Sequence, residues 1–315
     1  MKGSKTVLKI VKYLSFIVLI ILIILVGFVF IIPMTFDSST PPLNYGKVDS
    51  KLFLGDGKEQ PLLVYFGGSE GGNSMTKPHN IKERQQYIDQ GYALLAVGYF
   101  GMEGIPQELD RISLDAIYNE IVLTLNNPRL NLNCVAVMGG SKGAELALTL
   151  ASKYTKINGA VSLAGSHVVF AGPSFFADGK TSSFMFNDQE LPHVPLTLEI
   201  LPSVLMGDLR RAHEIALMDI DSVEGARIKV EDVNGPILLV SGEKDHIWPS
   251  QEMSEEVVNR LKNKGFTHPF KHIMVPDGNH FQPQNDYHPE VIKFLDENFL
   301  PRCDAHYQNI TQHMH

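Results

Sequence analysis

The chain has 315 residues, of which 44% are hydrophobic, so it has the composition of a globular protein and the length of one large domain or two ordinary ones. Its formal net charge is −8 with histidine neutral, and its basic residues cluster only near the N-terminus. This acidic balance argues against nucleic acid as a partner.

An uncharged apolar run covers residues 13–32 and follows a segment, 1–12, that contains four lysines. At about 1.5 Å per residue the run is long enough to cross a bilayer as a helix. A cleaved signal peptide is the alternative, but the run is long for one and no small-residue cleavage site follows it. We therefore expect an uncleaved transmembrane signal anchor, with the lysine-rich end in the cytoplasm and the rest of the chain outside.

The segment 33–47 contains the sequence SSTPP, which predicts a stiff, exposed spacer. The globular domain is expected over residues 48–300, with 301–315 as a C-terminal tail. Within the domain, apolar runs alternate with amphipathic segments. Strands are expected at 48–53, 62–66, 93–97, 134–138, 160–164, 237–240 and 270–275, and helices at 81–90, 114–125, 144–151, 251–264 and 289–299. This alternation favours an α/β fold with a mostly parallel, doubly wound sheet.

One interval, 166–234, is far longer than a typical connection between elements and has its own helix pattern at about 207–218. In a doubly wound sheet, insertions over the carboxyl ends of the strands lie above the active site. We expect a cap here; a surface excursion without function is the alternative.

The motif GGSKG at 139–143 lies between an apolar strand and an Ala/Leu-rich helix. Strand, G-x-S-x-G and helix in this order form a nucleophile elbow, in which the glycines let strand and helix approach closely and leave Ser141 exposed at the helix N-terminus. A phosphate-binding loop or an incidental serine in a glycine-rich turn is the alternative. In a nucleophile elbow, the backbone N–H of Lys142 would face the oxyanion that forms on the substrate.

A nucleophilic serine needs a base and a carboxylate that orients the base, and in this architecture they follow it in the order acid, then histidine. Asp245 and His280 each stand just after a predicted strand, at the edge of the sheet where a site is built. Glu243 is the closest rival as the acid. Among twelve histidines, position after the last strand singles out His280.

The second donor of an oxyanion hole comes from the loop after an earlier strand. The glycine-rich segment GGSEGG at 67–72 follows the strand 62–66, and Ser69 is the first candidate donor, with Gly68 second. A phosphate loop is the competing interpretation, but the segment lacks a G-K-[ST] ending. His79, His167 and His193 have no neighbours at ligand spacing, so neither a metal nor a cofactor is expected.

The chain has two cysteines, Cys134 on a predicted central strand and Cys303 near the C-terminus. A disulfide between them is arithmetically possible. A cysteine on a core strand is more often a small apolar residue, so we expect two free thiols.

Several separated motifs together resemble one family. They are GGSKGAELAL at 139–148, FGGSEGG at 66–72, YFG at 99–101, SHVV at 166–169 and SGEKDHIWPS at 241–250. In this order they resemble the C-terminal catalytic domain shared by acyl-CoA thioesterases and bile-acid-CoA:amino-acid N-acyltransferase, an α/β-hydrolase family related to dienelactone hydrolase. The resemblance spans about residues 48–300 and implies that Ser141, Asp245 and His280 stand at the triad positions.

This chain differs from the family in two features, the segment before the hydrolase domain and the residue at the elbow. The segment 33–47 is too short for the β-sandwich that precedes the hydrolase domain in the thioesterases. The amine-transferring relatives carry cysteine at the elbow, whereas Ser141 favours water as acceptor. We expect a membrane-tethered serine hydrolase of an acyl ester or thioester; an acyltransferase to an amine, a non-catalytic binding protein on the same fold and a peptidase are the alternatives.

Overall fold

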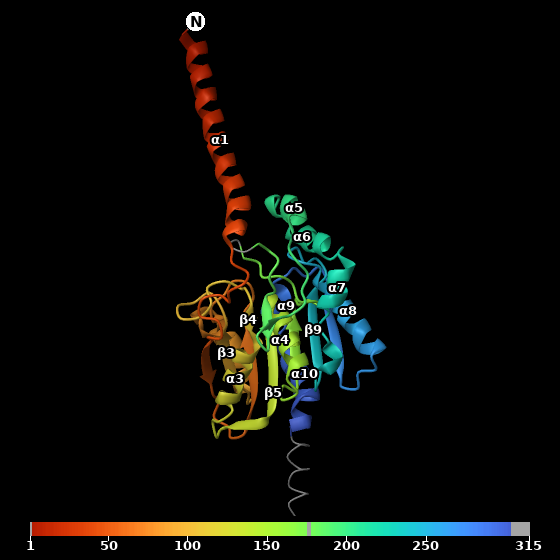
Figure 1. Ribbon diagram of the computed structural model, residues 1–315. Coiled ribbons are helices and arrows are strands. Elements are labelled where there is room, and N and C mark those ends of the chain that lie inside the picture. The colour runs from red at the N-terminus through yellow and green to blue at the C-terminus, as the bar shows by residue number, and fades with distance from the viewer. Residues whose placement is uncertain (1, 175–177, 304–315) are drawn as a thin grey trace, which may run out of the picture.

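The computed structural model describes residues 2–174 and 178–303, and its body is built around a seven-stranded sheet (Figure 1). The strands lie in the order β1-β3-β2-β5-β6-β9-β10. The edge strand β1 is antiparallel to β3, and the other neighbours pair in parallel. The bounds are β1 Asp49–Phe53, β2 Gln60–Phe66, β3 Ala93–Gly98, β5 Leu130–Gly140, β6 Ala160–Leu163, β9 Ile237–Gly242 and β10 Phe270–Val275. All seven predicted strands are present, which confirms the mostly parallel sheet.

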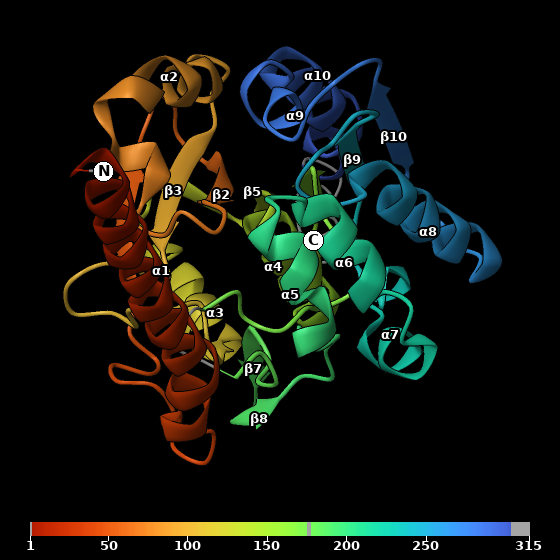
Figure 2. The same ribbon diagram turned by 90° about the horizontal axis from the view of Figure 1, so that it is seen from above.

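Helices cover both faces of the sheet, as the doubly wound prediction requires (Figure 2). Helices α2 and α10 lie on one face, and α3, α4 and α8 lie on the other. Along β2, Leu62 and Val64 pack with the second group, whereas Leu63 and Tyr65 pack with the first. Because both faces are buried, the central strands are apolar at nearly every position. The bounds are η1 Ser74–Thr76, η2 Pro78–Asn80, α2 Ile81–Asp89, α3 Leu114–Thr124, α4 Lys142–Lys153, α8 Ser250–Asn263, α9 Gln282–Asn285 and α10 His288–Asn298.

The strand order reverses direction between β2 and β5. From β2 the chain proceeds to β3 on one side, and from β5 it proceeds through β6 and β9 to β10 on the other. In open α/β sheets, ligands bind outside the carboxyl ends of the strands at such a switch point. The glycine-rich loop 67–72 and the GGSKG turn follow β2 and β5, so both lie at this point.

The interval between β6 and β9 forms a separate layer above the carboxyl ends of the strands. A small apolar core joins this cap to the body and includes Phe170 and Val194 of the cap and Trp248 and Met253 of the body. The bounds are β7 Phe184–Phe186, β8 Gln189–Glu190, η3 Leu198–Ile200, α5 Leu201–Leu205, α6 Leu209–Ala216, α7 Ile220–Ala226 and η4 Val230–Asp232. The sequence had predicted one helix here; it did not predict the second sheet, in which β7 and β8 pair with β4 (Ile112–Ser113). Residues 175–177 of the predicted cap lie outside the described residues.

Helix α1 (Lys2–Thr35) projects from the body on the side of the cap (Figure 1). Its window Val7–Ile24 has a mean hydropathy of 2.7 and none of it is buried, so by length and composition the helix can cross a membrane. The helix continues beyond the predicted apolar run and ends at Thr35. The spacer that follows is mostly exposed, but Arg111 donates to the carbonyls of Ser38 (2.7 Å) and Asp37 (3.4 Å), so its first residues are fastened to the body.

The expectation of two free thiols is wrong. Cys134 and Cys303 form a disulfide, with their Cα atoms 5.4 Å apart. Cys134 lies in β5 and Cys303 follows α10, which packs on the face of the sheet toward which Cys134 points. The fold thus brings together two cysteines that are 169 residues apart in sequence. Most of the predicted tail, residues 304–315, lies outside the described residues.

Candidate active site

Strand β5 ends at Gly140 and α4 begins at Lys142, so Ser141 alone forms the turn between them. Ser141 has φ 54° and ψ −121°, a conformation that is strained for a residue with a side chain. Hydrogen bonds hold it there: its N–H donates to Leu163 of β6 (2.9 Å), and its carbonyl accepts from Ala144 (2.9 Å) and Glu145 (3.2 Å). The structure therefore contains the sharp turn that the motif predicts, with a half-buried serine at its apex.

The glycines of the motif are required by close approaches of the backbone. A Cβ at Gly139 would collide with the Gly143 carbonyl, and a Cβ at Gly143 would collide with the carbonyls of Phe66 and Gly67. The first approach lets β5 turn directly into α4. The second brings α4 against the end of β2, so the serine lies beside the glycine-rich loop.

Asp245 and His280 meet although they lie in loops that follow different strands, β9 and β10. The Nδ1 atom of His280 lies 2.8 Å from Oδ2 of Asp245, and both side chains are buried. The other carboxylate oxygen of Asp245 accepts from the N–H groups of Ile247 (2.9 Å) and Trp248 (3.2 Å). An ionised carboxylate can only accept, so Nδ1 of His280 donates and Nε2 is left as the acceptor.

Gln284 of α9 lies between the backbone of His280 and the end of β5. Its amide donates to the His280 carbonyl (2.9 Å), and its side chain occupies the space that a Cβ at Gly140 would need. Within the described residues, no hydrogen bond joins the Ser141 hydroxyl to the imidazole.

The rival residues lie elsewhere or have other partners. Glu243 accepts from the N–H of Asp277 (2.8 Å), His272 pairs with the Ser241 hydroxyl (2.7 Å), and His288 pairs with the Tyr87 hydroxyl (2.7 Å). His246 is exposed. The buried hydrogen bond between Asp245 and His280 distinguishes these two residues from the others.

Of the three candidate oxyanion donors, Lys142 and Gly68 lie next to the serine. Lys142 is the first residue of α4, where N–H groups have no partner within the helix. Gly68 is buried, and a Cβ there would lie 3.1 Å from the Ser141 Cβ, whereas Ser69 is exposed. The Gly68 N–H donates to Oε1 of Glu70 at 3.1 Å.

A buried ion pair lies directly after the turn. The Lys142 Nζ and Glu145 Oε1 atoms are 2.6 Å apart, and the same oxygen accepts from the Phe170 N–H of the cap at 3.1 Å. Burial lowers the pKa of Lys142 and raises that of Glu145, while the charge of each partner opposes the shift of the other. This pair therefore ties the first turn of α4 to the base of the cap.

Sequence reasoning missed Glu70, Gln284 and Trp248 as neighbours of the site. The Trp248 ring centroid lies 6.0 Å from that of His280, and its Nε1 donates to the Ala164 carbonyl (2.8 Å), which fixes the ring. Trp248 is the single tryptophan of the chain and stands three residues after Asp245, which was an available signal. No sequence signal pointed to Gln284, because its contacts depend on where α9 packs.

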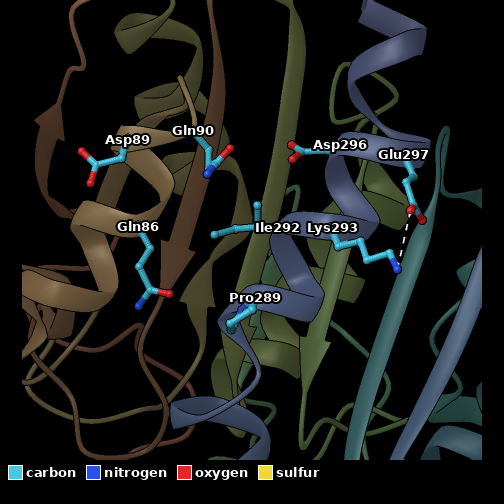
Figure 3. A pocket seen from close by; sticks show the side chains of 8 residues that line it. All are labelled: Gln86, Asp89, Gln90, Pro289, Ile292, Lys293, Asp296 and Glu297. Carbon is cyan, nitrogen blue, oxygen red and sulfur yellow. Dashed lines mark ion pairs between the residues drawn. The ribbon is translucent and has the colours of Figure 1, made fainter.

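A surface pocket elsewhere has different chemistry. It lies between α2 and α10, and Figure 3 shows side chains of both helices around it, including Asp89, Asp296 and the pair Lys293–Glu297 (4.0 Å). Its lining contains neither histidine nor a serine, and the described residues include no cluster of three or more side chains that could hold a metal.

Residues 116–295 match the family model described as "BAAT / Acyl-CoA thioester hydrolase C terminal". The match covers more than half of the chain. The chain belongs to this family. Helix α4, Ser141, Asp245 and His280 lie within the matched residues, whereas the glycine-rich loop 67–72 lies outside them.

Two mouse relatives show the extent of the likeness. Acyl-coenzyme A thioesterase 3 is 26% identical over 84% of this chain and 54% of its own length. Acyl-coenzyme A amino acid N-acyltransferase 1 is 23% identical over 70% of this chain and 48% of its own length. The chain thus spans about half the length of these curated relatives.

Solved structures establish the fold. A puromycin-hydrolyzing peptidase of Mycobacterium tuberculosis superposes with a TM-score of 0.56 at 16% identity, covering 82% of this chain and 39% of that one. An acylaminoacyl peptidase of Pyrococcus horikoshii gives 0.55 at 15% identity, over 80% and 40%. The family member described here therefore has the α/β-hydrolase fold, as predicted.

Proposed function

We propose that the protein is a serine hydrolase that cleaves an acyl thioester or a carboxylic ester through an acyl-Ser141 intermediate. The observation that carries this proposal is the convergence of Ser141, held in a strained turn, with a buried His280–Asp245 pair at the same edge of the sheet. The relatives named as acyl-coenzyme A thioesterases support a thioester as the substrate class.

In the first half-reaction, the Ser141 hydroxyl attacks the acyl carbon while Nε2 of His280 takes its proton. The tetrahedral oxyanion is held by the N–H groups of Lys142 and Gly68, and the N-terminus of α4 adds a favourable dipole. His280 then gives the proton to the departing thiol or alcohol, and the acyl group stays on Ser141. Asp245 holds the imidazole in the required tautomer throughout.

In the second half-reaction, water attacks the acyl-serine. His280 accepts a proton from the water and returns it to the Ser141 oxygen, which releases the carboxylic acid and restores the site. An amine in place of water would give an amide. Product analysis with and without added glycine distinguishes these acceptors; we expect the free acid in both cases, and acyl-glycine would establish the acyltransferase alternative.

The proposal is tested with the full-length chain and a fluorophosphonate probe. Wild type should be labelled, and Ser141→Ala should lose the label and at least about 10³-fold of its turnover on acyl esters and thioesters. Ser39→Ala, which changes an exposed serine of the spacer, is the matched control and should keep both. Equal labelling of wild type and Ser141→Ala would overturn the assignment. A folded wild type without label or turnover would favour a binding protein.

We further propose that residues 13–32 anchor the protein in a membrane, with residues 1–12 in the cytoplasm and the 48–300 domain outside. The support is the apolar helix α1, the lysines before it and the Cys134–Cys303 disulfide, because disulfides persist in oxidising compartments. Protease added to spheroplasts should digest the domain and leave a short protected stub. Full protection until lysis would reverse the orientation and make cytoplasmic acyl-CoA the leading substrate.

A further inference from the structure

The cap has an apolar tip on the side of the body from which α1 projects (Figure 1). We define the tip as residues 198–207, which include η3, α5 and the turn after α5. Its exposed side chains are largely apolar: Leu198 is 60% exposed, Leu205 59% and Met206 78%. Glu199 is the one charged residue of the ten. Apolar side chains gathered on an exposed element mark a surface that binds a partner or a membrane.

The position of the tip indicates which partner it meets. Figure 1 shows α5 level with the last turns of α1, on the side of the body from which α1 projects. Figure 2, looking down on that side, shows α5 above the region of α4. A bilayer that α1 crosses would therefore lie on the same side of the body as the tip.

The connection between α1 and the body supports this geometry. Arg111, which is buried and paired with Asp110 (2.9 Å), donates to the carbonyls of Asp37 and Ser38 and lies over the Phe36 ring at 5.4 Å. The body is therefore fastened within two or three residues of the end of α1. Leu43, which is 80% exposed, adds a further apolar side chain on the same connecting segment.

We propose that the tip inserts into the lipid leaflet that α1 enters, so that the carboxyl end of β5, where Ser141 lies, is on the side of the membrane surface and the site takes acyl chains from it. This inference rests on the proposed insertion of α1, but it does not depend on the chemistry of Ser141. Apolar side chains on a short amphipathic element enter the interfacial region of a bilayer readily, whereas an acidic side chain at the same place opposes insertion.

The direct test places a fluorophore on the tip. The full-length protein is reconstituted in phosphatidylcholine nanodiscs, with the environment-sensitive dye NBD on a single introduced cysteine. Met206→Cys reports on the tip, and Lys262→Cys, at an exposed position near the end of α8, is the control. The native cysteines are joined in a disulfide, so the introduced thiol is the one that reacts.

Insertion predicts blue-shifted emission and quenching by doxyl-labelled lipid at 206 and neither at 262. Similar quenching at both positions, or none at 206, would overturn the proposal whether or not the protein is catalytic.

A second experiment measures hydrolysis rates of two variants in which an exposed leucine is replaced by aspartate. Leu205→Asp changes the tip, and Leu132→Asp changes a residue that is 55% exposed near the start of β5, at the opposite edge of the sheet. We expect Leu205→Asp to lower the ratio of lipid-embedded to water-soluble ester hydrolysis about tenfold. Leu132→Asp should leave the ratio unchanged. An unchanged ratio in Leu205→Asp would count against the proposal, whereas absence of all hydrolysis would count against the proposed function alone.

Discussion

His280 and Asp245, 35 residues apart in the sequence, form a buried hydrogen bond of 2.8 Å between Nδ1 and Oδ2. Burial by itself raises the pKa of the Asp245 carboxyl. The hydrogen bond and the charge of His280 lower it by more, and hydrogen bonds from Ser250 and Ile247 act in the same direction. The pKa of Asp245 therefore lies below its usual value. The carboxylate therefore stays ionised at any pH at which the imidazole can act as a base.

Asp245→Asn tests the role of this bond. The amide has nearly the same shape but can donate to Nδ1, which would place the proton on Nε2 and leave no base facing Ser141. We expect kcat to fall about 10³- to 10⁴-fold with little change in KM. Glu243→Gln, the matched change at the rival acid, should keep wild-type kcat. Steady-state kinetics on a soluble ester measures both, and an equal loss in the two variants would remove Asp245 from the mechanism.

The Glu70 carboxylate accepts the Gly68 N–H at 3.1 Å. In the proposed mechanism the oxyanion uses the same N–H, so it would have to displace this carboxylate. If Gly68 is the second donor, Glu70→Ala should raise kcat/KM about three- to tenfold, the equivalent of about 1 kcal/mol. Glu103→Ala, at an exposed glutamate in the loop after β3, should change nothing. A fall in kcat/KM for Glu70→Ala would show that the carboxylate supports the loop instead.

His167 makes stability depend on pH. Burial, together with the charge of Arg227, lowers the pKa of its imidazole from 6.5 to about 4, and its Nδ1 has no hydrogen-bond partner among the described residues. As pH falls from 6.5 toward 4, the unfolded chain binds a proton that the folded chain does not, so the free energy of unfolding decreases.

His167→Gln should flatten this dependence. Between pH 7 and 4.5 we expect the wild type to lose about 2–3 kcal/mol more stability than the variant. Urea unfolding at the two pH values measures the difference, with His79→Gln, at an exposed histidine, behaving as wild type. Parallel losses in wild type and His167→Gln would contradict the assignment.

The disulfide closes a very long loop. In the loop-entropy model such a bridge stabilises the folded state, and its removal commonly costs about 2–5 kcal/mol. Cys303→Ser should therefore lower the guanidinium midpoint, and added reductant should lower that of the wild type while leaving the variant unchanged. Hydrolysis should persist, because Cys134 lies toward the amino end of β5, away from Ser141. A reductant-insensitive wild type would mean that the bridge contributes nothing to stability.

Much of the site could be predicted because its decisive features are local. The apolar strand, the glycines and the helix around Ser141 stand next to one another in the sequence. Glycine at 139 permits the close approach to Gly143 by which the strand turns directly into the helix. Asp245 and His280 were predicted from a rule of position after strands, which holds because parallel strands end at one edge. Whether Ser69 or Gly68 is the better candidate for the second oxyanion donor could not be predicted from neighbouring residues, because it depends on which backbone amide packs against Ser141.

The sequence by itself determined the order of strands and helices, the elbow at Ser141 and the apolar helix near the N-terminus, since periodicity and glycine placement act over a few residues. The tertiary structure alone decided that Cys134 meets Cys303, that Glu145 binds the cap at Phe170 and that Arg111 holds the segment after α1. These contacts join residues far apart in the chain, and their geometry follows from how the whole sheet twists and packs. No local pattern encodes that packing.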